Sequence, residues 1–202
     1  MPASFPPAPW ILVGRAIIVP AFLRPGGSGS APGGGARRTL GGLLVGDCDA
    51  HSTLPYRELL GVEGIEWSSL LPAARVTVAR VDHDGSVAGG RALWGIPKAR
   101  ATFAWHESPS GVEVTVTDPA GGVATVVARS RRRGRSMPVL GRFVGVDGRP
   151  AWVQGRLHGA LARVRVHVPP GSPLAGSRPA YSSVGWLGEV SLRVRAPRRE
   201  GA

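Results

Sequence analysis

Apolar and polar side chains alternate with a period of two along most of this chain, which is the pattern of half-buried β-strands. In residues 160–168, Val164 and Val166 alternate with Arg163, Arg165 and His167. The 30 glycines and 19 prolines suit many short strands joined by tight turns. We therefore expect a mainly β protein, a barrel or sandwich, with at most two or three short helices.

The expected strands are spread along the whole chain. Turn-forming residues at 118–122 and 147–150 predict two hairpins. One short helix is expected at residues 86–94, with Ser86 as its N-cap. The strands are predicted at residues 10–22, 40–45, 74–82, 111–117, 123–129, 143–146, 151–157, 160–168 and 184–194.

The length of 202 residues predicts one domain over residues 1–202 with a buried core. We expect disordered tails at residues 1–8 and 197–202 and a flexible glycine-rich loop at residues 25–36. The apolar stretch after Trp10 is too interrupted to span a bilayer. Cys48 is the only cysteine, which excludes an internal disulfide and a cysteine-based zinc site. These features predict a cytoplasmic protein without a membrane segment or metal.

The formal net charge of +12 comes almost entirely from arginine. The densest basic run is residues 129–135, and aromatic residues, 6% of the chain, are not interleaved with it. No zinc-finger, RNA-recognition or helix-turn-helix pattern accompanies the charge. We expect solvated arginines and no specific nucleic-acid binding, although a basic nucleic-acid-associated protein remains an alternative.

Lys98 is the only lysine of the chain and follows the apolar segment 93–97. Arginine replaces lysine well as a surface charge, but it does not lose its proton and act as a nucleophile. A lysine amine does so when its surroundings lower its pKa. A coding bias against lysine also explains a single survivor, so the neighbouring sequence has to decide.

Three segments resemble the acetoacetate decarboxylase family in order and spacing. Residues 90–98 read Gly-Arg-x-x-x-x-x-Pro-Lys, which is similar to the family's Schiff-base lysine motif. Tyr56 and Glu58 resemble its Tyr-x-Glu element, and Arg15 lies in a strand that resembles the family's N-terminal strand. The resemblance covers residues 10–105.

The resemblance implies a cone-like β-barrel or sandwich, homo-oligomeric assembly and a carbon–carbon lyase without metal or organic cofactor. Lys98 would form a Schiff base with a small keto acid, most simply to decarboxylate a β-keto acid, and Glu58 would be its acidic partner. Arg15 and Arg91 would bind the substrate carboxylate as bidentate donors. Tyr56 and Trp94 would form pocket wall.

Other interpretations stay open. The same iminium chemistry serves an aldolase-dehydratase, and a barrel that only binds a small ligand needs no chemistry. Glu58 could form a surface ion pair, Arg15 could be solvated, and Arg91 could anchor a turn.

Ala99 stands where the family carries a second lysine. Activation of Lys98 would then come from burial or from a nearby arginine such as Arg100, which shares a strand face with Lys98.

Overall fold

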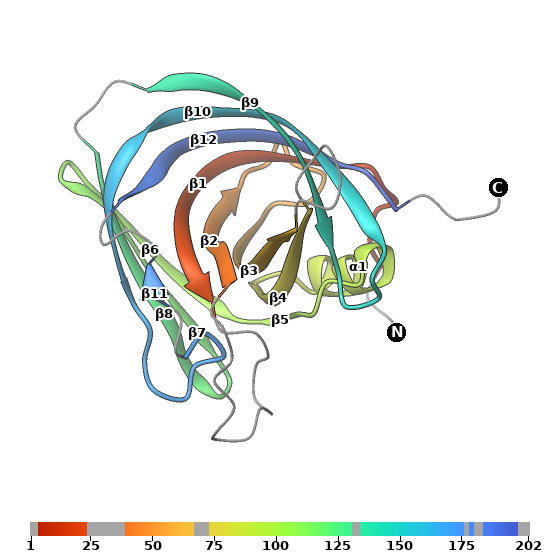
Figure 1. Ribbon diagram of the computed structural model, residues 1–202, viewed down its shortest axis with the longest axis horizontal. Helices are drawn as coiled ribbons and strands as arrows, with labels where there is room; N and C mark the ends of the chain where they lie inside the picture. The colour runs from red at the N-terminus through yellow and green to blue at the C-terminus, as the bar shows by residue number, and fades with distance from the viewer. Residues whose placement is uncertain are drawn as a thin grey trace.

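Seven strands of the described chain close into a β-barrel (Figure 1). The computed structural model describes residues 4–23, 39–66, 73–130, 134–175, 178–179 and 184–197. Neighbouring strands of the ring are antiparallel, except that β4 and β9 pair in parallel. The ring runs through β1 (Trp10–Leu23), β2 (Thr39–Cys48), β3 (Tyr56–Glu66), β4 (Ala73–Val81), β9 (Arg135–Val144), β10 (Pro150–His167) and β12 (Val184–Val194), which returns to β1.

A three-stranded antiparallel sheet continues from the far end of β10 and packs against the outside of the barrel. It consists of β8 (Gly121–Arg129), β7 (Gly111–Asp118) and β6 (Thr102–Ser108). Its valines Val114, Val116 and Val126 meet Val45 and Leu59 of the barrel strands in what we call the outer core. The barrel and its flanking sheet confirm the predicted mainly β architecture.

The barrel strands next to this sheet carry buried side chains on both faces. Strand β1 shows which of its side chains belong to the outer core and which to the barrel interior. Ile17 and Val19 belong to the outer core. Ala16 and Ile18, one position away, face the interior of the barrel. Because successive side chains of a strand point to opposite faces, one strand serves both surfaces.

The single helix of the described chain, α1 (Asp84–Trp94), lies at one end of the barrel (Figure 1). It begins two residues earlier than predicted, with His83 rather than Ser86 as N-cap, and Ser86 lies inside the helix. Trp94 packs edge-on against Trp10, with ring centroids 4.9 Å apart. Phe5 packs against the same cluster, within the segment 1–8 for which the sequence predicted a disordered tail, and residues 1–3 lie outside the described ranges.

The hairpin of β7 and β8 and the long strands β1, β4 and β12 lie where they were predicted. The two strands expected at residues 151–157 and 160–168 form the single strand β10. Strands β3 and β6 and the short β5 (Lys98–Arg100) and β11 (Arg178–Pro179) were not predicted. The glycine-rich loop predicted at residues 25–36 lies outside the described residues.

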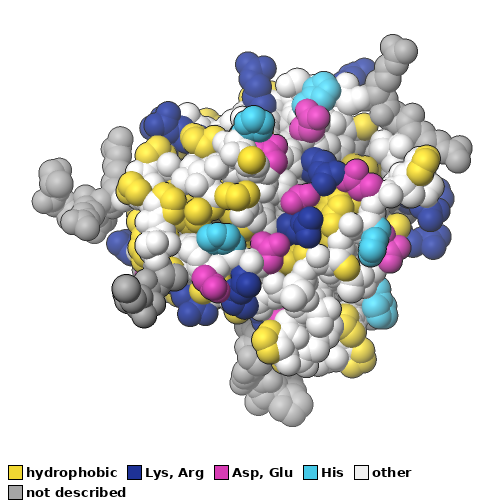
Figure 2. Space-filling model, turned by 180° about the vertical axis from the view of Figure 1, so that it is seen from behind, with side chains coloured by type: hydrophobic (Ala, Val, Ile, Leu, Met, Phe, Trp, Pro, Cys, Tyr) yellow, Lys and Arg dark blue, Asp and Glu magenta, His cyan; other side chains and the backbone are white. Residues whose placement is uncertain are grey.

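Charges of both signs share the molecular face seen in Figure 2, where arginine side chains lie among acidic and histidine side chains. Ion pairs neutralise several arginines: Arg80 Nε lies 2.8 Å from Asp118 Oδ2, and Arg149 pairs with Asp147 at 2.6 Å. Part of the basic run, residues 131–133, lies outside the described ranges. No helix within those ranges is long and apolar enough to cross a membrane.

Truncation of Leu59 tests how much the outer core stabilises the fold. Leu59 is 0% exposed, so Leu59→Ala should lower the free energy of unfolding by about 2–5 kcal/mol through lost burial and a residual cavity. Leu161, which is 52% exposed, is the matched control, and Leu161→Ala should change the free energy of unfolding by less than about 0.5 kcal/mol. Chemical denaturation measures both, and equal losses would contradict this account of the core.

Candidate active site

The segment between α1 and β5 fixes the backbone of Lys98. The helix ends at Gly95, whose φ of 61° is left-handed and therefore favours glycine. The Ile96 amide donates back to the Gly90 carbonyl at 3.1 Å, and Pro97 prevents the helix from continuing. Lys98 then starts β5, which pairs in parallel with β4.

The Lys98 side chain is buried, with 3% exposure, and its amine has three hydrogen-bond partners. Nζ donates to Ser86 Oγ at 2.9 Å, to Tyr56 Oη at 3.3 Å and to Glu58 Oε2 at 3.4 Å. Nζ also lies 4.6 Å from the centroid of the Tyr56 ring. The predicted pairing of Lys98 with Glu58 is present in the structure, and it is buried rather than at the surface.

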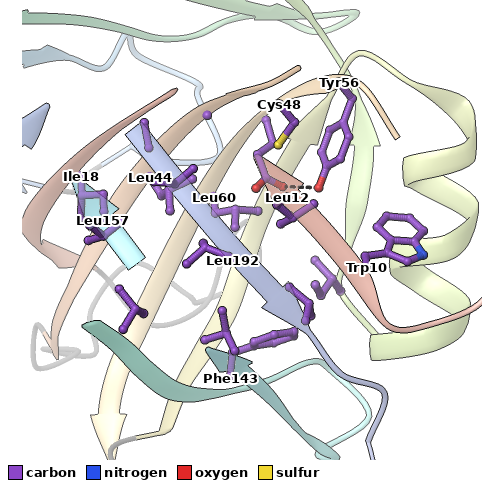
Figure 3. A pocket seen from close by; sticks show the side chains of 18 of the residues that line it. Trp10, Leu12, Ile18, Leu44, Cys48, Tyr56, Leu60, Phe143, Leu157 and Leu192 are labelled. Carbon is purple, nitrogen blue, oxygen red and sulfur yellow. Dashed lines mark hydrogen bonds between the residues drawn. The ribbon is translucent and has the colours of Figure 1, made fainter. Parts of the chain in front are cut away.

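Tyr56 and Glu58 lie two positions apart on β3, so both side chains are on the same face, which is the one toward the barrel interior. Tyr56 Oη donates to Glu58 Oε2 at 3.2 Å (Figure 3). Burial raises the pKa of Tyr56 well above its usual value, and the charge of Glu58 raises it further. Tyr56 therefore stays a neutral hydrogen-bond donor beside the amine.

Gly90 gives the Lys98 side chain its path past α1. A Cβ atom at Gly90 would lie 2.5 Å from Lys98 Cδ and 2.9 Å from Cε, closer than any side chain accepts. The Gly-Arg pair of the lysine motif thus has two roles: Gly90 leaves room for the side chain, and Arg91 binds the backbone. Arg91 Nε donates to the Lys98 carbonyl at 2.8 Å.

Lys98 borders a cavity of about 230 Å³ inside the barrel. Figure 3 shows the labelled apolar side chains Ile18, Leu44 and Leu157 across this cavity from Tyr56. Tyr56, Glu58 and Lys98 form its polar wall, and Trp94 belongs to its apolar wall. Cys48 also borders it, and burial raises the pKa of this thiol far above its usual value. The remaining wall is formed by Trp10, Leu12, Ala16, Ile18, Leu44, Leu60, Ile96, Val139, Phe143, Val153, Leu157, Val190, Leu192 and Val194, with Arg15 and Gly46 at its border.

Arg15 does not present its guanidinium to the amine. It pairs with Asp47 at 2.7 Å and with Glu107 of the flanking sheet, and it lies over the ring of Trp105. Neither Asp47 nor Glu107 lines the cavity. Arg15 is among the residues that line the cavity, while its guanidinium pairs with Asp47 and Glu107.

Two other arginines also point elsewhere. Arg91 is exposed, is not among the residues that line the cavity, and donates to the Lys98 backbone carbonyl. Arg100 Nε lies 3.2 Å from Asp84 Oδ1 at the surface, where its side chain is 48% exposed. Among the described residues, Arg15 is the arginine that lines the cavity together with Lys98.

Comparison with solved structures identifies the architecture. Acetoacetate decarboxylase from Legionella pneumophila matches with a TM-score of 0.59 and 15% identity over 98% of this chain and 90% of that chain. The fold is that of acetoacetate decarboxylase. The enduracididine biosynthesis enzyme MppR matches with a TM-score of 0.63 and 15% identity, covering 97% of this chain and 91% of its own.

A third enzyme with the acetoacetate decarboxylase fold, an acetoacetate decarboxylase-like enzyme from Sphingomonas wittichii, matches with a TM-score of 0.54 and 13% identity. That match covers 96% of this chain and 93% of that chain. Neither protein-family models nor curated proteins match the sequence. At these identities the likeness concerns the acetoacetate decarboxylase fold, and the chemistry has to be argued from the residues of this chain.

Sequence reasoning missed Ser86, Trp10 and Cys48 as site residues. Ser86 is 0% exposed, yet it carries the shortest hydrogen bond to the amine. A serine at the expected start of a helix predicts an N-cap. The contact of its hydroxyl with Lys98 depends on the tertiary packing of α1 over β5, which the local sequence does not show. Trp10 could have been found, because it is separated by even numbers of positions from Leu12 and Ala16 on β1 and therefore lies on the same face of the strand.

Substitution of Gly90 tests the path of the lysine side chain. Gly90→Ala should displace Lys98 from Ser86 and Tyr56, because the new methyl group occupies the position of Cδ. Since Lys98 is the only lysine, protein labelled with [¹³Cε]lysine gives one side-chain signal, and Gly90→Ala should shift it.

Gly141→Ala is the matched control, because its Cβ would meet only Val153 Cγ1 at 3.7 Å. The control should leave the lysine signal in place. An unchanged signal in a folded Gly90→Ala variant would contradict the geometry.

Proposed function

We propose that this protein is a Schiff-base enzyme in which Lys98 attacks the carbonyl carbon of a keto acid, most simply to decarboxylate a 3-oxo acid. The observation that carries the proposal is a buried amine that is bonded to Glu58 and Tyr56 and opens onto an apolar cavity. A lysine in this setting has little use as a surface charge, and its neighbours are of the types that move protons in carbonyl chemistry.

Glu58 can prepare the nucleophile without a second cation. Proton transfer from Lys98 Nζ to Glu58 Oε2, 3.4 Å apart, turns an ammonium–carboxylate pair into an amine and a carboxylic acid. In this proposal the neutral amine arises by proton transfer to Glu58, and the family's second lysine, replaced here by Ala99, has no part in it.

The reaction then balances with the residues present. The neutral Nζ adds to the substrate carbonyl, Glu58 protonates the departing hydroxyl group, and water leaves as the iminium forms. The bond to the carboxylate breaks, carbon dioxide departs, and its electron pair enters the enamine. A proton returned to the α-carbon through Glu58 and addition of water then release the ketone and the amine, for a net consumption of one proton per carbon dioxide formed.

The apolar wall supports decarboxylation in particular. Asp47 and Glu107 already engage the guanidinium of Arg15, the arginine of the described lining, so a bound carboxylate would lose its hydration without gaining a free bidentate partner. Departure of carbon dioxide removes this charge, and the cavity is therefore better matched to the neutral product side of the reaction.

A second reaction through the same iminium is an aldol-type condensation. MppR has been solved with pyruvate and with the condensation product of pyruvate and imidazole 4-carboxaldehyde. The fold thus accommodates condensation products in a related structure. Carbon dioxide release from a 3-oxo acid separates the two reactions, since condensation releases none.

Reductive trapping tests the nucleophile. Incubation with acetoacetate or acetone and borohydride should add the mass of one reduced adduct to the tryptic peptide that contains residue 98. Lys98→Arg should abolish the adduct, because arginine keeps the charge but removes the nucleophile. Trapping in wild type at the N-terminal amine alone, with the peptide of residue 98 unmodified, would contradict the proposal.

Substitution of Glu58 separates proton transfer from imine formation. Glu58→Gln keeps the shape of the side chain and should lower carbon dioxide release by about 10²–10⁴-fold, the usual contribution of a general acid–base. The matched control Glu113→Gln changes an exposed carboxylate of β7 and should retain full activity. Carbon dioxide release by the Glu58→Gln variant at the wild-type rate would refute a catalytic role for Glu58.

A further inference from the structure

The cavity wall has one polar patch and a long apolar remainder (Figure 3). Resting on the proposed function, we infer that the substrate carries an apolar chain of medium length, as in 3-oxooctanoate, rather than the single methyl group of acetoacetate. The two polar lining residues that bond the amine, Tyr56 and Glu58, come from the single strand β3. The strands across the barrel contribute aliphatic side chains, among them Ile18 of β1, Val139 of β9 and Leu157 of β10.

This distribution fits a molecule with one polar end. A carbonyl carbon bonded to Lys98 places the adjacent groups against Glu58 and Tyr56. The rest of the substrate then lies along Leu60, Leu192 and the side chains across the barrel. A four-carbon acid leaves this wall without contacts, whereas each additional methylene buries apolar surface that water would otherwise cover.

A second charge on the chain would be unfavourable. Apart from Lys98, the cation that borders the described cavity is Arg15, and Asp47 and Glu107 already engage its guanidinium. A carboxylate at the far end of the chain would face Ile18 and Leu157 without a partner, which is costly in an apolar interior. The site therefore selects monofunctional carbonyl compounds over keto dicarboxylates.

Methyl ketones of increasing length measure this preference, because they are the products of 3-oxo acid decarboxylation and form the same imine. Trapping by borohydride at Lys98 is followed as a function of ketone concentration for acetone, 2-hexanone, 2-octanone and 7-oxooctanoate. The half-saturating concentration should fall about two- to fourfold per methylene from acetone to 2-octanone. The half-saturating concentration of 7-oxooctanoate, in which a carboxylate replaces the terminal methyl group of 2-octanone, should be at least about tenfold higher than that of 2-octanone.

The outcomes separate this inference from the proposed function. Equal half-saturation by acetone and 2-octanone, or preferred trapping of 7-oxooctanoate, would overturn the chain preference and leave the Schiff base intact. If no ketone is trapped, the Schiff base fails. The change in tryptophan emission on titration with 1-hexanol and 1-octanol then tests the chain preference by itself, because these alcohols lack a carbonyl and Trp10 and Trp94 border the cavity. Tighter binding of 1-octanol supports the preference, and equal binding overturns it.

Two positions on β10 provide a matched pair of variants. Leu157 lines the cavity, whereas Leu161 on the same strand is 52% exposed. Leu157→Trp should raise the half-saturating concentration of 2-octanone at least about tenfold relative to acetone, because the indole fills the space of the chain. Leu161→Trp should leave the ratio as in wild type. Val139→Phe on β9 tests the same wall if Leu157→Trp does not fold, and an unchanged ratio in a folded cavity variant would overturn the inference.

Discussion

Lys98 and Glu58 place a basic and an acidic group 3.4 Å apart inside the barrel, and the rest of the site is arranged around them. Removal of two such groups from water is costly, and their mutual attraction often only offsets that cost. Hydrogen bonds from the amine to Ser86 and Tyr56 complete the compensation. A pair of this kind adds little stability over well-packed apolar residues.

The pair exists only in the closed fold. Glu58 and Tyr56 come from β3, Lys98 from β5, and Ser86 from α1. The left-handed turn at Gly95 and the bond from Arg91 to the Lys98 carbonyl hold the lysine at the end of the helix. The parallel contact of β4 with β9 closes the ring and provides the apolar wall opposite the amine. The contacts that close the barrel and end the helix are therefore also the contacts that bring Lys98 beside Glu58, Tyr56 and Ser86.

Much of this could be predicted from the sequence, and the failures have physical causes. Alternation located the long strands, and the motif of residues 90–98 led to Lys98 and then to Glu58. The ion pairs of Arg15 with Asp47 and Glu107 could not be predicted, because they join distant segments of the chain. Strand β1 also carries apolar side chains on both faces, Ile17 in the outer core and Ile18 in the cavity. When both faces are apolar, a shift of one position exchanges the cavity for the outer core, and the sequence pattern does not distinguish them. Ser86 and the β4–β9 closure depend on packing between distant segments, which periodicity does not encode.

The most direct test of the central claim uses the fact that the chain has one lysine. Protein labelled with [¹⁵Nζ]lysine is mixed with an excess of [2-¹³C]acetone, and the carbon spectrum is recorded without a reducing agent. The account predicts an imine carbon signal split by one-bond coupling to the lysine nitrogen, and no such signal in Lys98→Arg. A folded wild-type protein whose lysine nitrogen never couples to the acetone carbon would show that the buried amine is not a nucleophile.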